Sequence, residues 1–99
     1  MNPYTYLTED ELSSQMADKI KTLRLAADWK QTTLAERSGV SLASLRRFEK
    51  KGLISLSSLL KLSIALGRQE DFCSLFDPAP IQSIEDLEKG EKVPQRGQI

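Results

Sequence analysis

Apolar residues in the first third of the chain recur with the period of an α-helix. They lie at spacings of three or four residues, at Leu12, Met16, Ile20, Leu23 and Ala27. This stripe predicts an amphipathic helix of about five turns that ends near Ala27, with Lys19, Lys21 and Arg24 off the centre of the inward face. Because Thr8 and Glu11 have the spacing of a capping box, the helix is expected to begin there.

Two shorter helices are predicted next. The first covers residues 31–38 with Leu34 inward, and Gly39 follows it as a residue that adopts a left-handed backbone at little steric cost. The second begins after Ser41, a good N-cap, and is closed by Gly52. Two short helices joined by a tight glycine turn form a helix-turn-helix arrangement.

The second of these short helices has two different faces. Leu45 and Phe48 are expected to point inward, whereas the other face carries two serines, an alanine and two arginines. A solvated face needs no particular composition, so small side chains followed by guanidinium groups suggest a surface for contact.

Two more helices complete the predicted domain. Ser55 caps a fourth helix over residues 56–66, whose leucines occupy more than one stripe and predict a helix that is central in the core or buried on two sides. A short fifth helix is predicted over residues 70–76, before Asp77-Pro78-Ala79-Pro80 breaks regular structure. Since no segment alternates as a strand, the fold class is all-α, with a five-helix domain over residues 8–76.

Residues 77–99 form a predicted C-terminal tail. They are polar and rich in charge, with Ile84 and Leu87 on one side of a small amphipathic stretch at 83–89. Two interpretations stay open. The tail is either flexible and disordered, because so few apolar groups cannot offset the entropy of ordering, or a segment that orders on a partner.

Charge is distributed unevenly along a chain whose formal net charge is zero. Residues 19–52 contain nine bases and three acids, a net charge of +6, whereas residues 1–18 contain four acids and no base. A neutral protein therefore still presents a basic face.

The remaining composition narrows the location and the class of protein. Cys73 is the only cysteine and lies in an apolar cluster, so we interpret it as core filler in a reducing compartment. No apolar run approaches membrane-spanning length, and the start is acidic where a secretory signal would be basic. We expect a cytoplasmic protein without a membrane partner.

Catalytic chemistry is not expected. The chain has no histidine, no cysteine pair, no glycine-rich phosphate loop and no nucleophile placed with a base. The prediction is therefore no enzyme, no metal and no cofactor. The carboxylates at 9–11 are explained by the positive end of the helix dipole.

Residues from 12 to 76 follow a known pattern. Its markers are Arg24, Gln31, Leu34-Ala35, Gly39-Val40, Leu45 and Glu49, with the spacing Q-x-x-L-A-x-x-x-G-V-x-x-x-x-L-x-x-x-E. The chain resembles the Cro/XRE family of phage-repressor-like helix-turn-helix domains. The resemblance implies a double-stranded DNA operator as partner and transcriptional repression.

The resemblance also implies roles for particular residues. Gln31 is expected to contact a backbone phosphate, and Arg24 and Glu49 are expected to form a structural ion pair. The family's base-contacting positions fall on Ser41, Leu42, Ala43, Ser44, Arg46 and Arg47. Lys30, Lys50 and Lys51 are expected to contact phosphates.

The two arginines of the third helix differ by one helical step of about 100 degrees, so one at most aims straight at the bases. We expect that one to bind guanine O6 and N7 and the other to reach phosphate, while Leu42 and Ala43 contact thymine methyl groups. Which arginine reads a base stays open.

Lys30 departs from the family pattern, which usually has Ser or Thr as the cap before the glutamine. Lysine accepts no hydrogen bond from the first amides of the helix. Either the second helix is less well capped, or its amides are left for a DNA phosphate.

Specific reading by one short helix ordinarily requires two copies on a pseudo-palindromic operator, so a homodimer is expected. Its predicted interface is the apolar end of the fold, at Leu66, Phe72, Leu75 and Phe76; the alternative is that these residues are plain core.

The size of the chain and its S-I-E-D-L tail also resemble the HipB-like antitoxins of HipA-like kinase toxins, which implies an autoregulating repressor that binds such a kinase. The alternatives are a free-standing XRE-type regulator and, from another class, a protein-binding adaptor that uses the same fold.

Overall fold

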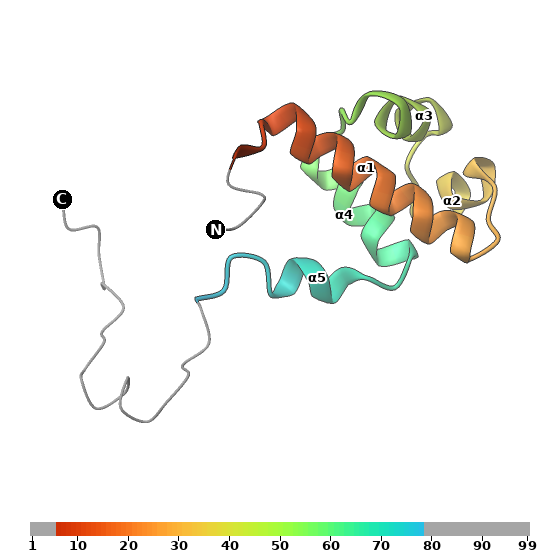
Figure 1. The fold of residues 1–99 in the computed structure, drawn as a ribbon. Helices are drawn as coiled ribbons and strands as arrows, with labels where there is room; N and C mark the ends of the chain where they lie inside the picture. The colour runs from red at the N-terminus through yellow and green to blue at the C-terminus, as the bar shows by residue number, and fades with distance from the viewer. Residues whose placement is uncertain (1–5, 79–99) are drawn as a thin grey trace, which may run out of the picture.

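The computed structural model describes residues 6–78, which form five helices and no strand. Figure 1 shows α1 lying across α4, with α3 and α2 at one side and α5 along the lower edge. The bounds are α1 Glu9–Ala26, α2 Gln31–Ser38, α3 Leu42–Lys51, α4 Leu56–Ala65 and α5 Gln69–Cys73. The predicted all-α, five-helix fold is confirmed.

Side-chain caps set the starts of three helices. At α1 the predicted capping box is present, since the Glu11 amide donates to Thr8 Oγ1 at 3.1 Å and the Thr8 amide donates to Glu11 Oε1 at 3.4 Å. Ser41 caps α3 and Ser55 caps α4, each by accepting a hydrogen bond from an amide three residues later.

The core lies where α1, α2, α3 and α4 meet. Leu34, Leu45, Phe48 and Leu62 are almost fully buried at its centre, and Val40 joins the turn between α2 and α3 to them. Together these side chains fix the angle between the two short helices. The complete set of buried apolar residues is Ala17, Ile20, Leu34, Ala35, Val40, Leu45, Phe48, Leu59 and Leu62.

The inward face of α1 matches the predicted stripe only in part, at Ile20 and the half-buried Leu23. Leu12 and Met16 are 44% and 39% exposed, whereas Ala17 and Arg24 are buried together with Ile20. The reason is a close approach of α3: a Cβ atom added at Gly52 would lie 3.1 Å from backbone atoms of Ser13 and Ser14. Helices approach this closely only where side chains are small, so the larger apolar residues of α1 lie to one side of the contact.

The C-terminal part of the fold is less buried than predicted. In α4, Leu59 and Leu62 belong to the core cluster, as expected for a helix central in the core, but Leu56 and Ile64 are exposed, so the alternative of burial on two sides is wrong.

The fifth helix is shorter than expected, and none of its residues is buried. It ends where the Ser74 hydroxyl donates back to the Glu70 carbonyl at 3.1 Å, shortly before Phe76 adopts a positive φ of 64°. Only Phe72 of this segment packs against the core. Cys73 is exposed, so its interpretation as core filler is wrong.

No helix within residues 6–78 is both long and apolar enough to cross a membrane. The predicted tail at 77–99 lies outside the described residues except for Asp77 and Pro78, so its two interpretations stay predictions.

Candidate nucleic-acid interface

One flank of α3 is anchored in the core and the opposite flank is open. Leu45 and Phe48 are the anchors, with relative exposures of 0% and 1%. The structure brings the predicted base-contacting positions together on and beside the open flank, but with different exposure: Ser41, Ala43, Arg46 and Arg47 are exposed, while Leu42 and Ser44 are half-buried.

Leu42 has a structural role as well as a predicted functional one. Its side chain packs against the core cluster, so only part of it is left for a thymine methyl group. Ala43, the next residue, is exposed. Of the two residues, Ala43 is therefore the more accessible for the predicted apolar contact.

A buried ion pair joins α1 to α3. Arg24 Nε donates to Glu49 Oε2 at 2.8 Å and Nη2 donates to Oε1 at 2.9 Å, with both side chains less than a tenth exposed. Arg24 Nη1 also donates to the Trp29 carbonyl at 2.8 Å, which holds the turn before α2. A bidentate pair of this kind is strong because both charges keep hydrogen-bond partners after they lose water.

Gln31 connects this pair to the open flank of α3. Its Nε2 donates to Glu49 Oε1 at 3.1 Å, and its Oε1 accepts from Arg46 Nε at 3.4 Å. Both ends of the amide are therefore engaged inside the protein. Sequence reasoning missed the link to Arg46, because a contact between residues fifteen apart on two helices depends on their crossing.

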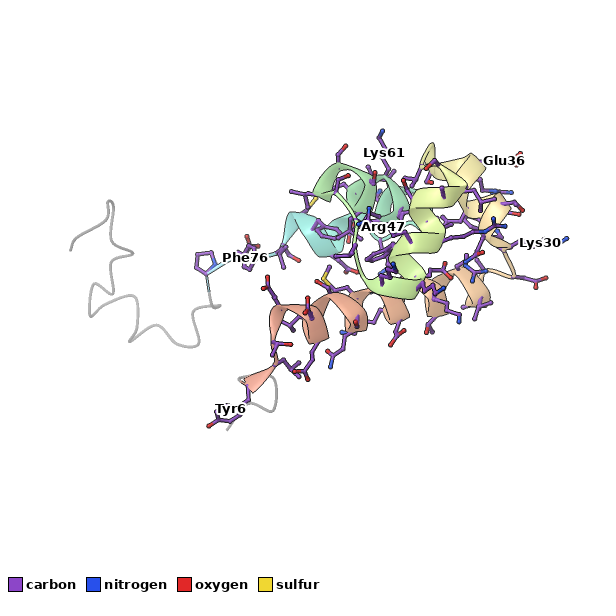
Figure 2. The ribbon with its side chains drawn as sticks, turned by 90° about the horizontal axis from the view of Figure 1, so that it is seen from above. Tyr6, Lys30, Glu36, Arg47, Lys61 and Phe76 are labelled. Carbon is purple, nitrogen blue, oxygen red and sulfur yellow. The ribbon has the colours of Figure 1, made fainter. Side chains whose placement is uncertain are left out.

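The first turn of α2 has no side-chain cap. Lys30 occupies the N-cap position, makes no capping hydrogen bond, and points into solvent in Figure 2. The first intrahelical bond runs from the Leu34 amide to the Lys30 carbonyl, so the amides of residues 31–33 precede the helical ladder. This turn contains no acid. Amides and dipole together make a positive site suited to an anion.

Lys50 and Lys51 lie exposed in the last turn of α3. Positive charge at this end also complements the helix dipole, so both lysines have a structural explanation beside the predicted phosphate contact.

An open groove of about 360 Å³ lies beside Arg47. Its lining consists of Ser44, Arg47, Leu53, Ile54, Ser55 and Ser58. Sequence reasoning assigned Ser55 only as a cap and gave Leu53 no role. Gly52 adopts a left-handed backbone with φ of 71°, and this turn places the connection after it alongside α3. The glycine is therefore the sequence signal that could have indicated this groove.

The four residues predicted for a dimer interface fall into two pairs. Leu66 and Phe72 are half-buried and pack against the core. Leu75 and Phe76 are exposed, and Phe76 is 92% exposed. Figure 2 shows Phe76 and Lys30 at opposite ends of the described molecule.

Two comparisons with known proteins bear on this geometry. A search of curated proteins finds no match. A family model described as helix-turn-helix matches residues 20–73, more than half of the chain, from the C-terminal half of α1 to the end of α5. The chain belongs to the helix-turn-helix family of Cro/XRE type, whose members are DNA-binding transcription regulators.

Proposed function

We propose that the protein is a sequence-specific repressor that places α3 in the major groove of an operator. The observation that carries this is the contrast on α3: Leu45 and Phe48 are buried, while Ser41, Ala43 and Arg47 stand exposed on or beside the other flank. A helix held in this way fits the groove, where arginine pairs with guanine and small apolar groups contact thymine.

Phosphates flank the reading surface in this proposal. One is bound by the uncapped amides of α2 and by Lys30, and another by Lys50 and Lys51 at the far end of α3. Phosphate contacts set the position of the helix on the duplex, and base contacts set the sequence that it prefers.

The proposal includes a homodimer on a pseudo-palindromic operator. Leu75 and Phe76 support it, because two large apolar side chains are left in water at one end of the fold. Leu66 and Phe72 would pack beneath this interface, between it and the core. Sedimentation of the purified protein tests this: a monomer at all accessible concentrations would contradict it.

The finer part of the proposal is that the protein is the antitoxin of a HipA-like kinase and represses its own operon in the cytoplasm. Its support is the resemblance of the tail, which lies outside the described residues. The protein has no enzymatic role in this proposal, in keeping with a chain that lacks histidine.

Gel-shift titration tests the function directly. A duplex recovered from a random pool on the wild-type protein is compared with a shuffled duplex of the same composition at one salt concentration. We expect at least about a thousandfold preference for the recovered duplex. Equal binding would contradict sequence-specific reading, and no binding to either would favour the adaptor.

The antitoxin role is tested separately. If the protein co-purifies with the product of a neighbouring kinase-like reading frame, the antitoxin role holds. Operator binding without such a neighbour would favour a free-standing regulator.

A further inference from the structure

Two adjacent arginines of α3 have different surroundings. Arg46 Nε donates to Gln31 Oε1 at 3.4 Å. Arg47 lines the groove with Ser44 and makes no hydrogen bond or ion pair with any residue from 6 to 78. One guanidinium is therefore held toward α2 before any ligand arrives, and the other has no such hold within the described residues.

Arg46 is connected through Gln31 to the buried ion pair between α1 and α3. Gln31 is fixed by its hydrogen bond to Glu49, and Glu49 is fixed by the bidentate pair with Arg24. The side chains of Arg24 and Glu49 are both over nine-tenths buried, whereas the last bond, from Arg46 to Gln31, lies at the exposed surface. Arg46 is thus oriented by a chain of hydrogen bonds from the core.

We infer that Gln31 is a positioning residue: it holds Arg46 against the phosphate at the first turn of α2 and so leaves Arg47 as the arginine that reads a base. This inference rests on the proposed function. It departs from the role that the family resemblance assigns to Gln31, which is direct contact with phosphate.

The hydrogen-bond inventory supports the departure. Gln31 Oε1 is an acceptor and cannot bind a phosphate oxygen, and one of the two N–H groups of Nε2 already donates to Glu49, so at most one N–H is left for an anion. Arg46 uses only Nε toward Gln31, so its terminal nitrogens keep their N–H groups for an anion. A charged donor also binds phosphate more strongly than a neutral amide.

Salt dependence separates the two roles of Gln31. Each cation that neutralises a phosphate releases counterions and adds about one to the slope of log K against log salt. A neutral amide releases none. A smaller slope after Gln31→Ala therefore means that a charged side chain no longer contacts phosphate.

The experiment measures the affinity and salt slope of the full chain for the duplex recovered from the random pool. We expect Gln31→Ala to weaken binding about threefold to tenfold and to lower the slope of log K against log salt by less than about one. Arg46→Ala should lower the slope by about one. Adding Gln31→Ala to Arg46→Ala should change neither quantity further.

Thr32→Ala is the matched control, since it removes a neutral exposed side chain from the same turn and should leave the slope unchanged. Gln31→Met keeps the length of the side chain without its hydrogen bonds, and replaces Gln31→Ala if thermal unfolding shows that variant to be unfolded.

The role of Arg47 is read from the shuffled duplex. Arg47→Ala should reduce the preference for the recovered duplex about five- to 150-fold. Arg46→Ala should weaken binding to both duplexes by the same factor. The two variants are therefore told apart by whether the preference for the recovered duplex changes.

If Gln31→Ala weakens binding equally with and without Arg46 and leaves the slope unchanged, Gln31 contacts phosphate itself and the inference is wrong, while the proposed function stands. If the wild-type protein shows no preference between the duplexes, the proposed function fails instead.

Discussion

The two flanks of α3 belong to the same ten residues but are determined by different forces. On the inward flank Leu45, Phe48 and Glu49 are all engaged by other helices, through packing or hydrogen bonds. On the outward flank Ala43 and Arg47 have no comparable partner in the described residues. The inward residues are explained by folding alone, and the outward ones are those that the proposed function assigns to DNA.

Magnitudes sharpen this contrast. Burial of a side chain the size of Phe48 is worth about 1.5–3 kcal/mol before any cavity is counted. A surface substitution away from caps and networks usually changes stability by less than about 0.5 kcal/mol. Variants on the two flanks should therefore separate into stability effects and binding effects.

The largest effect is expected at the centre of the inward flank. Phe48→Ala should lower the free energy of unfolding by about 3–5 kcal/mol, because it removes buried surface and leaves a cavity. Urea unfolding followed by circular dichroism measures this. A loss below about 1 kcal/mol would mean that α3 is not anchored as described.

Removing one partner of the buried ion pair comes next. Glu49→Ala should cost about 3 kcal/mol, since Arg24 would be left buried with its charge uncompensated. The matched control is Asp71→Ala, which breaks the Arg68–Asp71 pair of the same 2.8 Å length with both partners about half exposed. That change should cost less than about 1 kcal/mol. Similar losses in both variants would argue against a buried pair.

Gly52 tests how closely α3 approaches α1. Gly52→Ala should cost about 1–3 kcal/mol, because the added methyl group meets backbone atoms of α1 and the φ is positive. Gly39→Ala is the control: its φ of 77° is similar, but nothing lies within 4 Å of the added atom. The difference between their melting temperatures isolates the contact, and no difference would contradict it.

The outward flank should show the reverse behaviour. Arg47→Ala should leave the free energy of unfolding within about 0.5 kcal/mol of the wild type and weaken operator binding by about 1–3 kcal/mol. Thermal unfolding and gel-shift titration on one preparation measure both. If Arg47→Ala lowers the melting temperature but leaves operator affinity unchanged, Arg47 contributes to stability and not to DNA binding.

The smallest effect is expected at the start of α2. Lys30→Ser supplies the missing cap and should stabilise the protein by about 0.5–1 kcal/mol, while it weakens operator binding by removal of a cation and occupation of the free amides. Tighter operator binding by this variant would show that the amides are not left for a phosphate.

Local pattern was enough for the elements whose ends are set by neighbouring residues. The bounds of α2, the caps at Thr8, Ser41 and Ser55, and the burial of Leu34 follow from short-range chemistry and are confirmed. The inward face of α1 could not be predicted this way, because it depends on how near Gly52 brings α3.

The residues of the candidate site could be predicted, but the hydrogen bonds between their side chains could not. The positions on α3 could be named from the family pattern, and the geometry of the Arg24–Glu49 pair is now visible. The hydrogen bond between Arg46 and Gln31 depends on how α2 and α3 cross. The exposure of Cys73 follows from the shortness of α5. Neither feature produces a periodic pattern of apolar residues in the sequence.

The turn between α1 and α2 holds the only tryptophan of the chain. The guanidinium of Arg37 lies 4.5 Å from the centre of the Trp29 ring, and the Trp29 carbonyl accepts a hydrogen bond from Arg24. Trp29 directly precedes Lys30, the N-cap position of α2. Indole emission changes with nearby charge and hydration. Unlabelled protein thus has an intrinsic optical reporter beside the place where nucleic acid would arrive, free of background from any second indole.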